Sequence, residues 1–167
     1  HHSIDHDDAL SWNENTNTVS IYISNVALIM DYLELWSSFS NRISSIYLPD
    51  KKRPMLPNIL SECLCSLNEN EYHISFVLDI KVENNKAVSH KLSICNAYIS
   101  KNFTYSDDIE SCMPEYKNIK SFFKAKGNSE VVLKSMTYIN HYIAQYFSEK
   151  NVGIFKSLNQ KKDESIP

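Results

Sequence analysis

Hydrophobic and polar residues alternate in four stretches of the chain, which is the pattern of half-buried β-strands. Residues 9–12 and 19–26 form the first two stretches, and an asparagine-rich polar segment separates them, as expected for a turn. Residues 72–82 and 87–105 form a longer pair around the polar segment 83–86. The sequence therefore predicts two antiparallel strand pairs, the second of which is a long hairpin.

Two other stretches repeat their apolar residues with the period of an α-helix. The first covers residues 28–40. The second covers residues 130–149, and we expect either Asn128 or Ser129 to cap its N-terminus. Five apolar side chains of this second stretch fall on one stripe, which we expect to face the core: Val132, Met136, Ile139, Ile143 and Phe147.

Proline and glycine mark the segments between these elements. Residues 47–57 contain three prolines, so we expect this segment to be extended or turning. Residues 58–62 are expected to form one helical turn directly after it. A lysine-rich helix is predicted over residues 115–126, and we expect Gly127 to end it.

The end of the chain completes the predicted fold. Residues 152–155 predict a short final strand, and residues 157–167 form a charged tail that we expect to be mobile. The chain of 167 residues is long enough for one domain with a proper core. We therefore expect an α+β fold, a largely antiparallel sheet with packed helices, in one domain over residues 1–156.

Composition adds few constraints on function. A hydrophobic share of 43% and a charged share of 22% are ordinary for a soluble globular protein. The net charge of −3 gives no overall basic field that would attract nucleic acid, although basic side chains gather locally at residues 51–53 and 117–126. The chain has only 2 glycines, which excludes a glycine-rich phosphate-binding loop.

Two patterns bear on the cellular location. The 4 cysteines include no Cys-x-x-Cys pair and no secretory signal precedes them, so we expect reduced thiols. No apolar run approaches the roughly 18 residues that a membrane-spanning helix needs. We therefore expect no membrane partner and a cytoplasmic, or at least intracellular, location, with the nucleus also open.

An acidic cluster near the N-terminus is the strongest candidate for chemistry. Asp5, Asp7 and Asp8 fall within four positions, directly before Ala9 and Leu10. Mg²⁺ prefers oxygen ligands and commonly takes one or two carboxylates together with substrate phosphates. Metal ions held in this way promote the cleavage of phosphodiesters. The pattern alone fits either such a metal site or an acidic, frayed N-terminus.

Three motifs follow the acidic cluster in a fixed order: Tyr47-Leu48-Pro49, Pro54-Met55-Leu56-Pro57 and Leu64-Cys65-Ser66-Leu67. With them, the chain resembles the ribonuclease II (RNB) family of processive 3′→5′ exoribonucleases, in which these motifs follow an Asp-x-Asp-Asp-Ala cluster. Weaker matches to the family lie in four segments: residues 23–26, 103–105, 136–144 and 153–155.

The resemblance implies a partial RNB catalytic domain that uses Mg²⁺. Its metal ligands would be Asp5, Asp7 and Asp8, with Asp7 in the catalytic role. The reaction would remove nucleoside 5′-monophosphates one at a time from the 3′ end of single-stranded RNA.

The resemblance also implies RNA contacts away from the acidic cluster. Tyr47 matches a family tyrosine that stacks on a terminal base, and Tyr105 matches one near the ribose, whose 2′-hydroxyl separates RNA from DNA. Lys51 and Arg53, next to the Tyr-Leu-Pro motif, are further candidates for RNA binding.

Departures from the family pattern leave a second interpretation open. Leu133 and Lys134 stand where the family has paired glutamates. This sequence also lacks a family aspartate six positions before Asp5, the later Ser-Pro-Ile-Arg-Arg-Tyr segment and the flanking cold-shock and S1 domains. The alternative is a catalytically silent RNB-like module that binds RNA or a protein partner, or a domain that keeps the motifs for packing alone.

Overall fold

The computed structural model describes residues 6–39 and 44–155 and is built on a four-stranded antiparallel sheet. In spatial order, the strands are β1 (Asp8–Asn13), β2 (Thr18–Ser24), β5 (Glu71–Glu83) and β6 (Lys86–Ile99). The predicted α+β fold with two antiparallel strand pairs is confirmed. The last strand ends at Ile99 rather than at residue 105, and a loop follows it.

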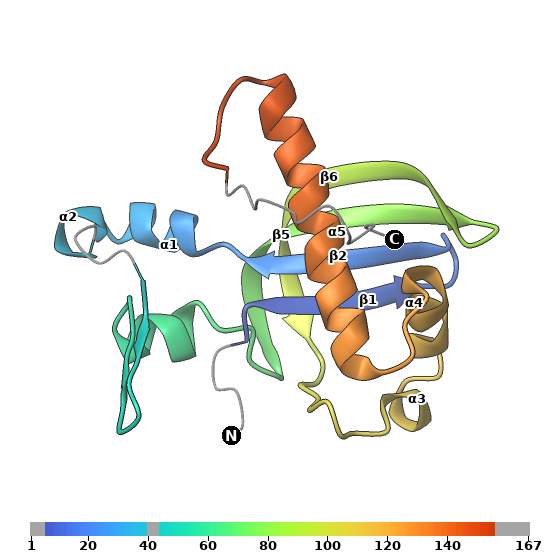
Figure 1. Ribbon diagram of the computed structural model, residues 1–167, viewed down its shortest axis with the longest axis horizontal. Coiled ribbons are helices and arrows are strands. Elements are labelled where there is room, and N and C mark those ends of the chain that lie inside the picture. The colour runs from blue at the N-terminus through green and yellow to red at the C-terminus, as the bar shows by residue number, and fades with distance from the viewer. Residues whose placement is uncertain (1–5, 40–43, 156–167) are drawn as a thin grey trace, which may run out of the picture.

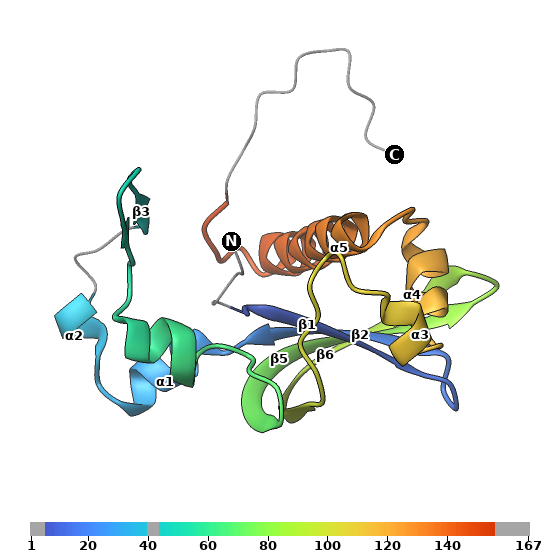
Figure 2. The same cartoon turned by 90° about the horizontal axis from the view of Figure 1, so that it is seen from below.

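Helices lie on one face of the sheet and beyond one of its ends (Figure 1, Figure 2). In chain order, the helical elements of the described residues are α1 (Val26–Tyr32), α2 (Trp36–Phe39), the π-helical segment η1 (Ile59–Leu64), α3 (Ile109–Cys112), α4 (Tyr116–Phe123) and α5 (Asn128–Glu149). α4 and α5 cover the face, whereas α1, α2 and η1 lie beyond the end, near a small hairpin of β3 (Ile46–Tyr47) and β4 (Lys52–Arg53). No helix of the described residues is long and apolar enough to cross a membrane.

The main core lies between the sheet and the helices α4 and α5. Val19 and Ile21 of β2 pair with Ile80 and Leu78 of β5, and all four side chains are fully buried. Ile119 of α4 packs into the same cluster. Each such side chain contributes about 1.5–3 kcal/mol through burial, so this layer fixes the sheet that carries the acidic residues.

The long strand β5 buries opposite faces in its two halves. His73, Ser75 and Val77 are buried in the first half, and Leu78 and Ile80 are buried in the second half. Successive side chains of a strand point to opposite faces, so the covered face changes between Val77 and Leu78. Only the second half is packed under α4 and α5.

The helix predicted over residues 28–40 is two helices in the described part of the chain. The first ends at Tyr32 and the second begins at Trp36. Between them Glu34 has a φ of 54°, a left-handed conformation that an α-helix cannot contain. The Trp36 indole N–H donates a hydrogen bond to Asp31 across this break. Residue 40 lies outside the described residues.

The prediction that Gly127 ends the lysine-rich helix is wrong. α4 ends at Phe123 because Lys124 takes the left-handed conformation, with a φ of 49°, and closes the helix. Gly127 is extended, with a φ of −145°, and is itself the N-cap of α5. Asn128, one of the two predicted caps, is the first residue of that helix, and its side chain bonds elsewhere.

The prediction of a strand over residues 152–155 is also wrong. The Val152 N–H donates to the Phe147 carbonyl at 3.0 Å, and Gly153 has a φ of 104°, so the chain turns back on the end of α5. Ile154 is fully exposed, and no described strand pairs with this segment. The tail predicted over residues 157–167 lies outside the described residues, and the domain boundary at residue 156 stays a prediction.

His90 of β6 connects the sheet to the long helix α5. Its Nε2 lies 2.7 Å from the Tyr138 hydroxyl, and its ring stacks on Tyr142 with 4.9 Å between ring centroids. Burial lowers the pKa of His90, because the charged imidazolium would lose solvation. The folded state therefore favours the neutral ring.

We expect Leu78→Ala to lower the free energy of unfolding by about 2–5 kcal/mol, since it leaves a cavity in the core. Ile154→Ala serves as the control, because a fully exposed side chain is expected to change stability by less than about 0.5 kcal/mol. Urea denaturation measures both values. Equal losses in the two variants would contradict the assignment of the core.

We also expect the free energy of unfolding to fall as the pH drops below about 6.5, the ordinary pKa of histidine. The unfolded chain takes up its proton there, whereas folded His90 does so only at lower pH, so the stabilisation is lost across that window. His90→Phe keeps a ring but cannot titrate, and it should flatten the dependence measured by urea denaturation from pH 5 to 7.5. His141→Phe, a change at an exposed position of α5, should not.

Candidate active site

We call residues 6–8, at the start of β1, the acidic segment. Hydrogen bonds join it to the Leu-Cys-Ser-Leu motif at residues 64–67. The His6 N–H donates to Ser66 Oγ at 3.0 Å, and the Leu67 N–H donates to the His6 carbonyl at 2.7 Å. Ser66 and Leu67 are both buried. Two motifs that lie about sixty residues apart in the sequence are therefore neighbours in space.

Asp7 and Asp8 have different surroundings. Asp7 is exposed, and Asp8, the first residue of β1, is partly buried. Burial and then the charge of Asp7 raise the pKa of Asp8, while His6 lowers it. Burial and the Asp7 charge also raise the pKa of the Cys65 thiol. Two neighbouring carboxylates, one of them poorly solvated, make a place where a cation is favoured.

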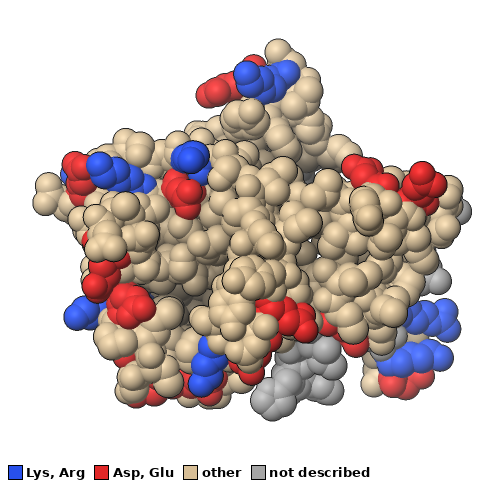
Figure 3. Space-filling model, turned by 180° about the vertical axis from the view of Figure 1, so that it is seen from behind, with Lys and Arg blue, Asp and Glu red and all other residues tan. Residues whose placement is uncertain are grey.

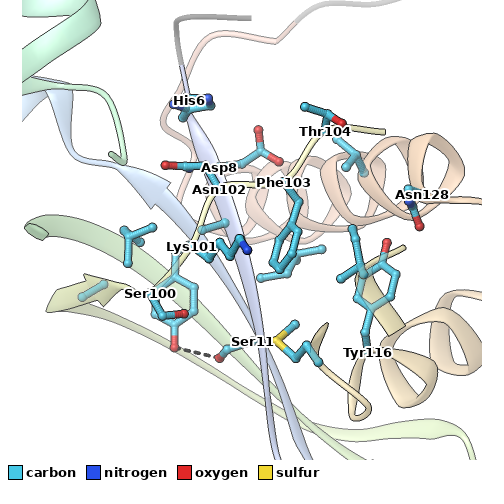
Figure 4. Close-up of a pocket in the computed structure, with 18 of the residues that line it drawn as sticks. His6, Asp8, Ser11, Ser100, Lys101, Asn102, Phe103, Thr104, Tyr116 and Asn128 are labelled. Atoms are coloured by element: carbon cyan, nitrogen blue, oxygen red, sulfur yellow. Dashed lines mark hydrogen bonds between the residues drawn. The ribbon is translucent and has the colours of Figure 1, made fainter. Parts of the chain in front are cut away.

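Asp8 lines a cavity of about 310 Å³ beside β1. Figure 4 shows His6, Asp8 and Asn102 at one end of this cavity and Tyr116 and Asn128 at the other. β1 and the end of β6 both line it, although they are opposite edges of the sheet. The sheet therefore curls until its two edges approach one another, and the cavity lies at this junction.

The loop after β6 forms an aromatic wall of the cavity and is held at both ends by asparagine side chains. Asn102 Nδ2 donates to the Leu67 carbonyl at 3.0 Å. Asn128 Nδ2 donates to the carbonyls of Tyr105 and Asp107 at 3.1 and 3.0 Å. We call residues 102–107 the aromatic loop, since Phe103 and Tyr105 line the cavity from it.

The structure separates the predicted RNA-binding residues into two groups. Tyr105 lines the cavity together with Asp8. Tyr47, Lys51 and Arg53 belong to the β3–β4 hairpin, which stands apart from β1, and none of them lines the cavity (Figure 1). The predicted metal ligand Asp5 lies outside the described residues.

The described part of the chain offers two neighbouring carboxylates as possible ligands for Mg²⁺. Residues 6–39 and 44–155 contain no group of three His, Cys, Asp or Glu side chains that could hold a metal ion. Asp7 and Asp8 provide two carboxylates, the number that Mg²⁺ often takes from a protein when phosphates supply further oxygens. A cation would also offset the repulsion that raises the pKa of Asp8. By number and chemistry these two carboxylates fit Mg²⁺ in that mode; Asp8 lines the cavity, and Asp7 is exposed outside its lining.

His6, Asn102 and Asn128 are among the cavity residues that were not predicted as site residues. His6 Nδ1 is buried and has no hydrogen-bond partner within the described structure. Asn102 directly precedes the Phe-Thr-Tyr motif, but its partner Leu67 lies 35 positions away. A bond over that sequence distance leaves no local pattern from which the role of Asn102 could be predicted.

Charged side chains form no large surface of one sign on the face shown in Figure 3. Basic and acidic groups are mixed around its rim, and its centre is uncharged. Together with the net charge of −3, this gives no long-range field for attracting RNA from that side. Recognition of a polyanion on this face would have to depend on short-range contacts.

Comparison with known sequences gives one family. The sequence profile of the RNB domain matches residues 1–121. Ribonuclease R from Buchnera aphidicola (subsp. Schizaphis graminum, strain Sg) is 27% identical over 176 residues, covering 93% of this chain and 24% of that protein. Exoribonuclease 2 from Buchnera aphidicola (subsp. Acyrthosiphon pisum, strain Tuc7) is 35% identical over 106 residues, covering 61% of this chain and 16% of that protein. The chain thus spans about a quarter or less of these relatives.

Solved structures agree with the sequence comparison. Mycoplasma genitalium RNase R in complex with double-stranded RNA matches with a TM-score of 0.52 and 26% identity, over 78% of this chain and 23% of that chain. The same enzyme in complex with ribose-methylated single-stranded RNA matches with a TM-score of 0.51 and 25% identity, over 80% and 20%. On the profile match over most of its length, this chain belongs to the RNB domain family.

Proposed function

We propose that this chain forms part of the active site of a Mg²⁺-dependent 3′→5′ exoribonuclease that releases nucleoside 5′-monophosphates from single-stranded RNA. The observation that carries the proposal is that Asp8 and Tyr105, from two separate family motifs, line one cavity in a member of the RNB family. Relatives named ribonuclease R and exoribonuclease 2 support the reaction, and the RNA complexes of Mycoplasma genitalium RNase R support the substrate class.

The acidic residues would divide the chemistry between them. Asp7 and Asp8 would hold Mg²⁺ together with oxygens of the terminal phosphodiester. When bound, the cation supplies positive charge beside the phosphate and favours attack by water. Asp8 begins a strand, so the sheet fixes the direction of its carboxylate. Asp7 is open to solvent and would orient the attacking water, which is the catalytic role that the family resemblance assigns to it.

Aromatic side chains would hold the RNA by stacking, which contributes about 1–3 kcal/mol per base. Tyr105 is 66% exposed, so its ring is accessible from the cavity, and its position suits contact with the ribose 2′-hydroxyl. Tyr47 is 75% exposed and lies on the separate hairpin. We therefore propose that Tyr47 contacts a base outside this cavity, with Lys51 and Arg53 on nearby phosphates.

We expect 5′-labelled single-stranded RNA to shorten from its 3′ end in the presence of Mg²⁺ and to stay intact in EDTA. Asp7→Asn keeps the shape of the side chain and removes its charge, and it should slow the decay by about 10²–10⁴-fold. Glu149→Gln removes the same charge at the exposed end of α5 and should leave the rate unchanged. Undiminished Mg²⁺-dependent decay in Asp7→Asn would contradict the role of Asp7.

A second candidate function is a catalytically silent module that binds RNA or a protein partner. It is favoured by the residues that replace the family's paired glutamates. Lys134 Nζ pairs with Glu130 at 2.7 Å and donates to the Lys124 carbonyl at 2.8 Å, so that position joins α4 to α5. Leu133 beside it is 66% exposed. Neither side chain offers a carboxylate to a ribose.

RNA binding with and without metal separates the two candidates. For the exoribonuclease we expect Mg²⁺ to strengthen the binding of single-stranded RNA, measured by fluorescence anisotropy, and Asp8→Asn to remove this gain. A silent module should bind RNA with the same affinity in Mg²⁺ and in EDTA, and Asp8→Asn should then change nothing. Circular dichroism of each variant controls for folding.

A further inference from the structure

Leu67 connects two walls of the candidate active site through its main chain. Its N–H donates to the His6 carbonyl at 2.7 Å, and its carbonyl accepts from Asn102 Nδ2 at 3.0 Å. Only 1% of Leu67 is exposed, so water does not compete readily for either bond. One buried residue thus joins the acidic segment on one side and the aromatic loop on the other.

Asn102 is held more firmly than its side-chain bond alone would suggest. Its backbone N–H donates to Glu69 Oε2 at 3.1 Å, and Glu69 lies two positions beyond Leu67. Asn102 therefore bonds the 67–69 segment twice, through its side chain and through its main chain. The Asn102 side chain also lines the cavity, next to Asp8 (Figure 4).

The far end of the aromatic loop has a different anchor. Asn128 holds the carbonyls of Tyr105 and Asp107 to the start of α5. Within the loop, the Thr104 N–H donates to Asp107 Oδ2 at 2.6 Å, which braces its shape. Asn128 therefore fixes one end of the loop to α5. Asn102 fixes the other end to Leu67, which in turn bonds the acidic segment at His6.

We infer that Asn102 is a positioning residue that sets the separation between Asp8 and the aromatic loop, and so the width of the slot that receives the RNA end. The inference rests on the proposed function. Asn102 itself need not touch the RNA. If its side-chain bond is lost, the acidic residues keep their places on the sheet while Tyr105 moves more freely relative to them. RNA binding should then weaken, and binding of a divalent cation should not.

The test centres on a variant of Asn102 that keeps the size of the side chain and removes its donor. Asn102→Asp replaces the Nδ2 donor with an oxygen that repels the Leu67 carbonyl, while Asn102→Gln keeps an amide donor. Asn96→Asp is the matched control, because it makes the same chemical change at an exposed position of β6. Asn102→Ala removes the bond without adding charge and serves if the aspartate variant does not fold.

Hydrogen exchange of single amides, measured by NMR, reads the anchor directly. In Asn102→Asp we expect about tenfold faster exchange at residues 103–105, since one hydrogen bond is lost, and unchanged exchange at Leu67, whose N–H donates to the His6 carbonyl. Asn96→Asp should match the wild type, and Asn102→Gln should recover part of the protection. Asn128→Asp should affect only the end of the loop near Tyr105 and Asp107. Unchanged exchange at residues 103–105 in Asn102→Asp would overturn the inference, whether or not RNA binds.

A second readout separates positioning from general stability. Mn²⁺ stands in for Mg²⁺, and its affinity is measured by electron paramagnetic resonance alongside the affinity for single-stranded RNA. We expect Asn102→Ala, which adds no charge beside Asp8, to weaken RNA binding by about tenfold and to leave Mn²⁺ binding unchanged. Equal loss of both would overturn the inference. If wild-type chain binds no RNA while exchange responds as expected, the proposed function fails and the anchoring by Asn102 is still supported.

Discussion

The candidate active site depends on the pairing of one buried backbone unit, the N–H and carbonyl of Leu67. Buried backbone polar groups must find partners, and here the partners are the acidic segment at His6 and the aromatic loop at Asn102. The Leu67 side chain is buried, so the unit cannot shift without leaving the interior. The acidic segment and the aromatic loop, from distant parts of the chain, are thereby both bonded to the backbone of the same buried residue.

The curl of the sheet makes this meeting possible. In the order β1-β2-β5-β6, the acidic strand and the strand before the aromatic loop are opposite edges. β5 changes its buried face at Val77–Leu78, and the side chains buried on its first half include His73 and Ser75. β1 and the end of β6 line the same cavity, so the curl of the sheet brings side chains of its two edges into one site.

Much of the fold, but less of the site, could be predicted from the sequence. Alternating residues predicted the strands because successive side chains of a strand point to opposite faces, and the ordered motifs indicated the RNB family. The single helix over residues 28–40 failed because a left-handed Glu34 has no sequence signature as clear as glycine. The final strand failed because its hydrophobic residues have no neighbouring strand among the described residues to pair with. The bond from Asn102 to Leu67 joins residues 35 positions apart, so only the folded chain reveals it.

The most direct test of this account is paramagnetic broadening of the amide NMR signals by Mn²⁺, which accepts the same oxygen ligands as Mg²⁺. The account predicts selective broadening of three segments that meet at the cavity: residues 6–8, 65–67 and 102–105. Residues 51–53 of the β3–β4 hairpin should stay sharp. Broadening centred elsewhere, or none at concentrations that saturate a weak site, would contradict the claim that these segments form one cation-binding active site.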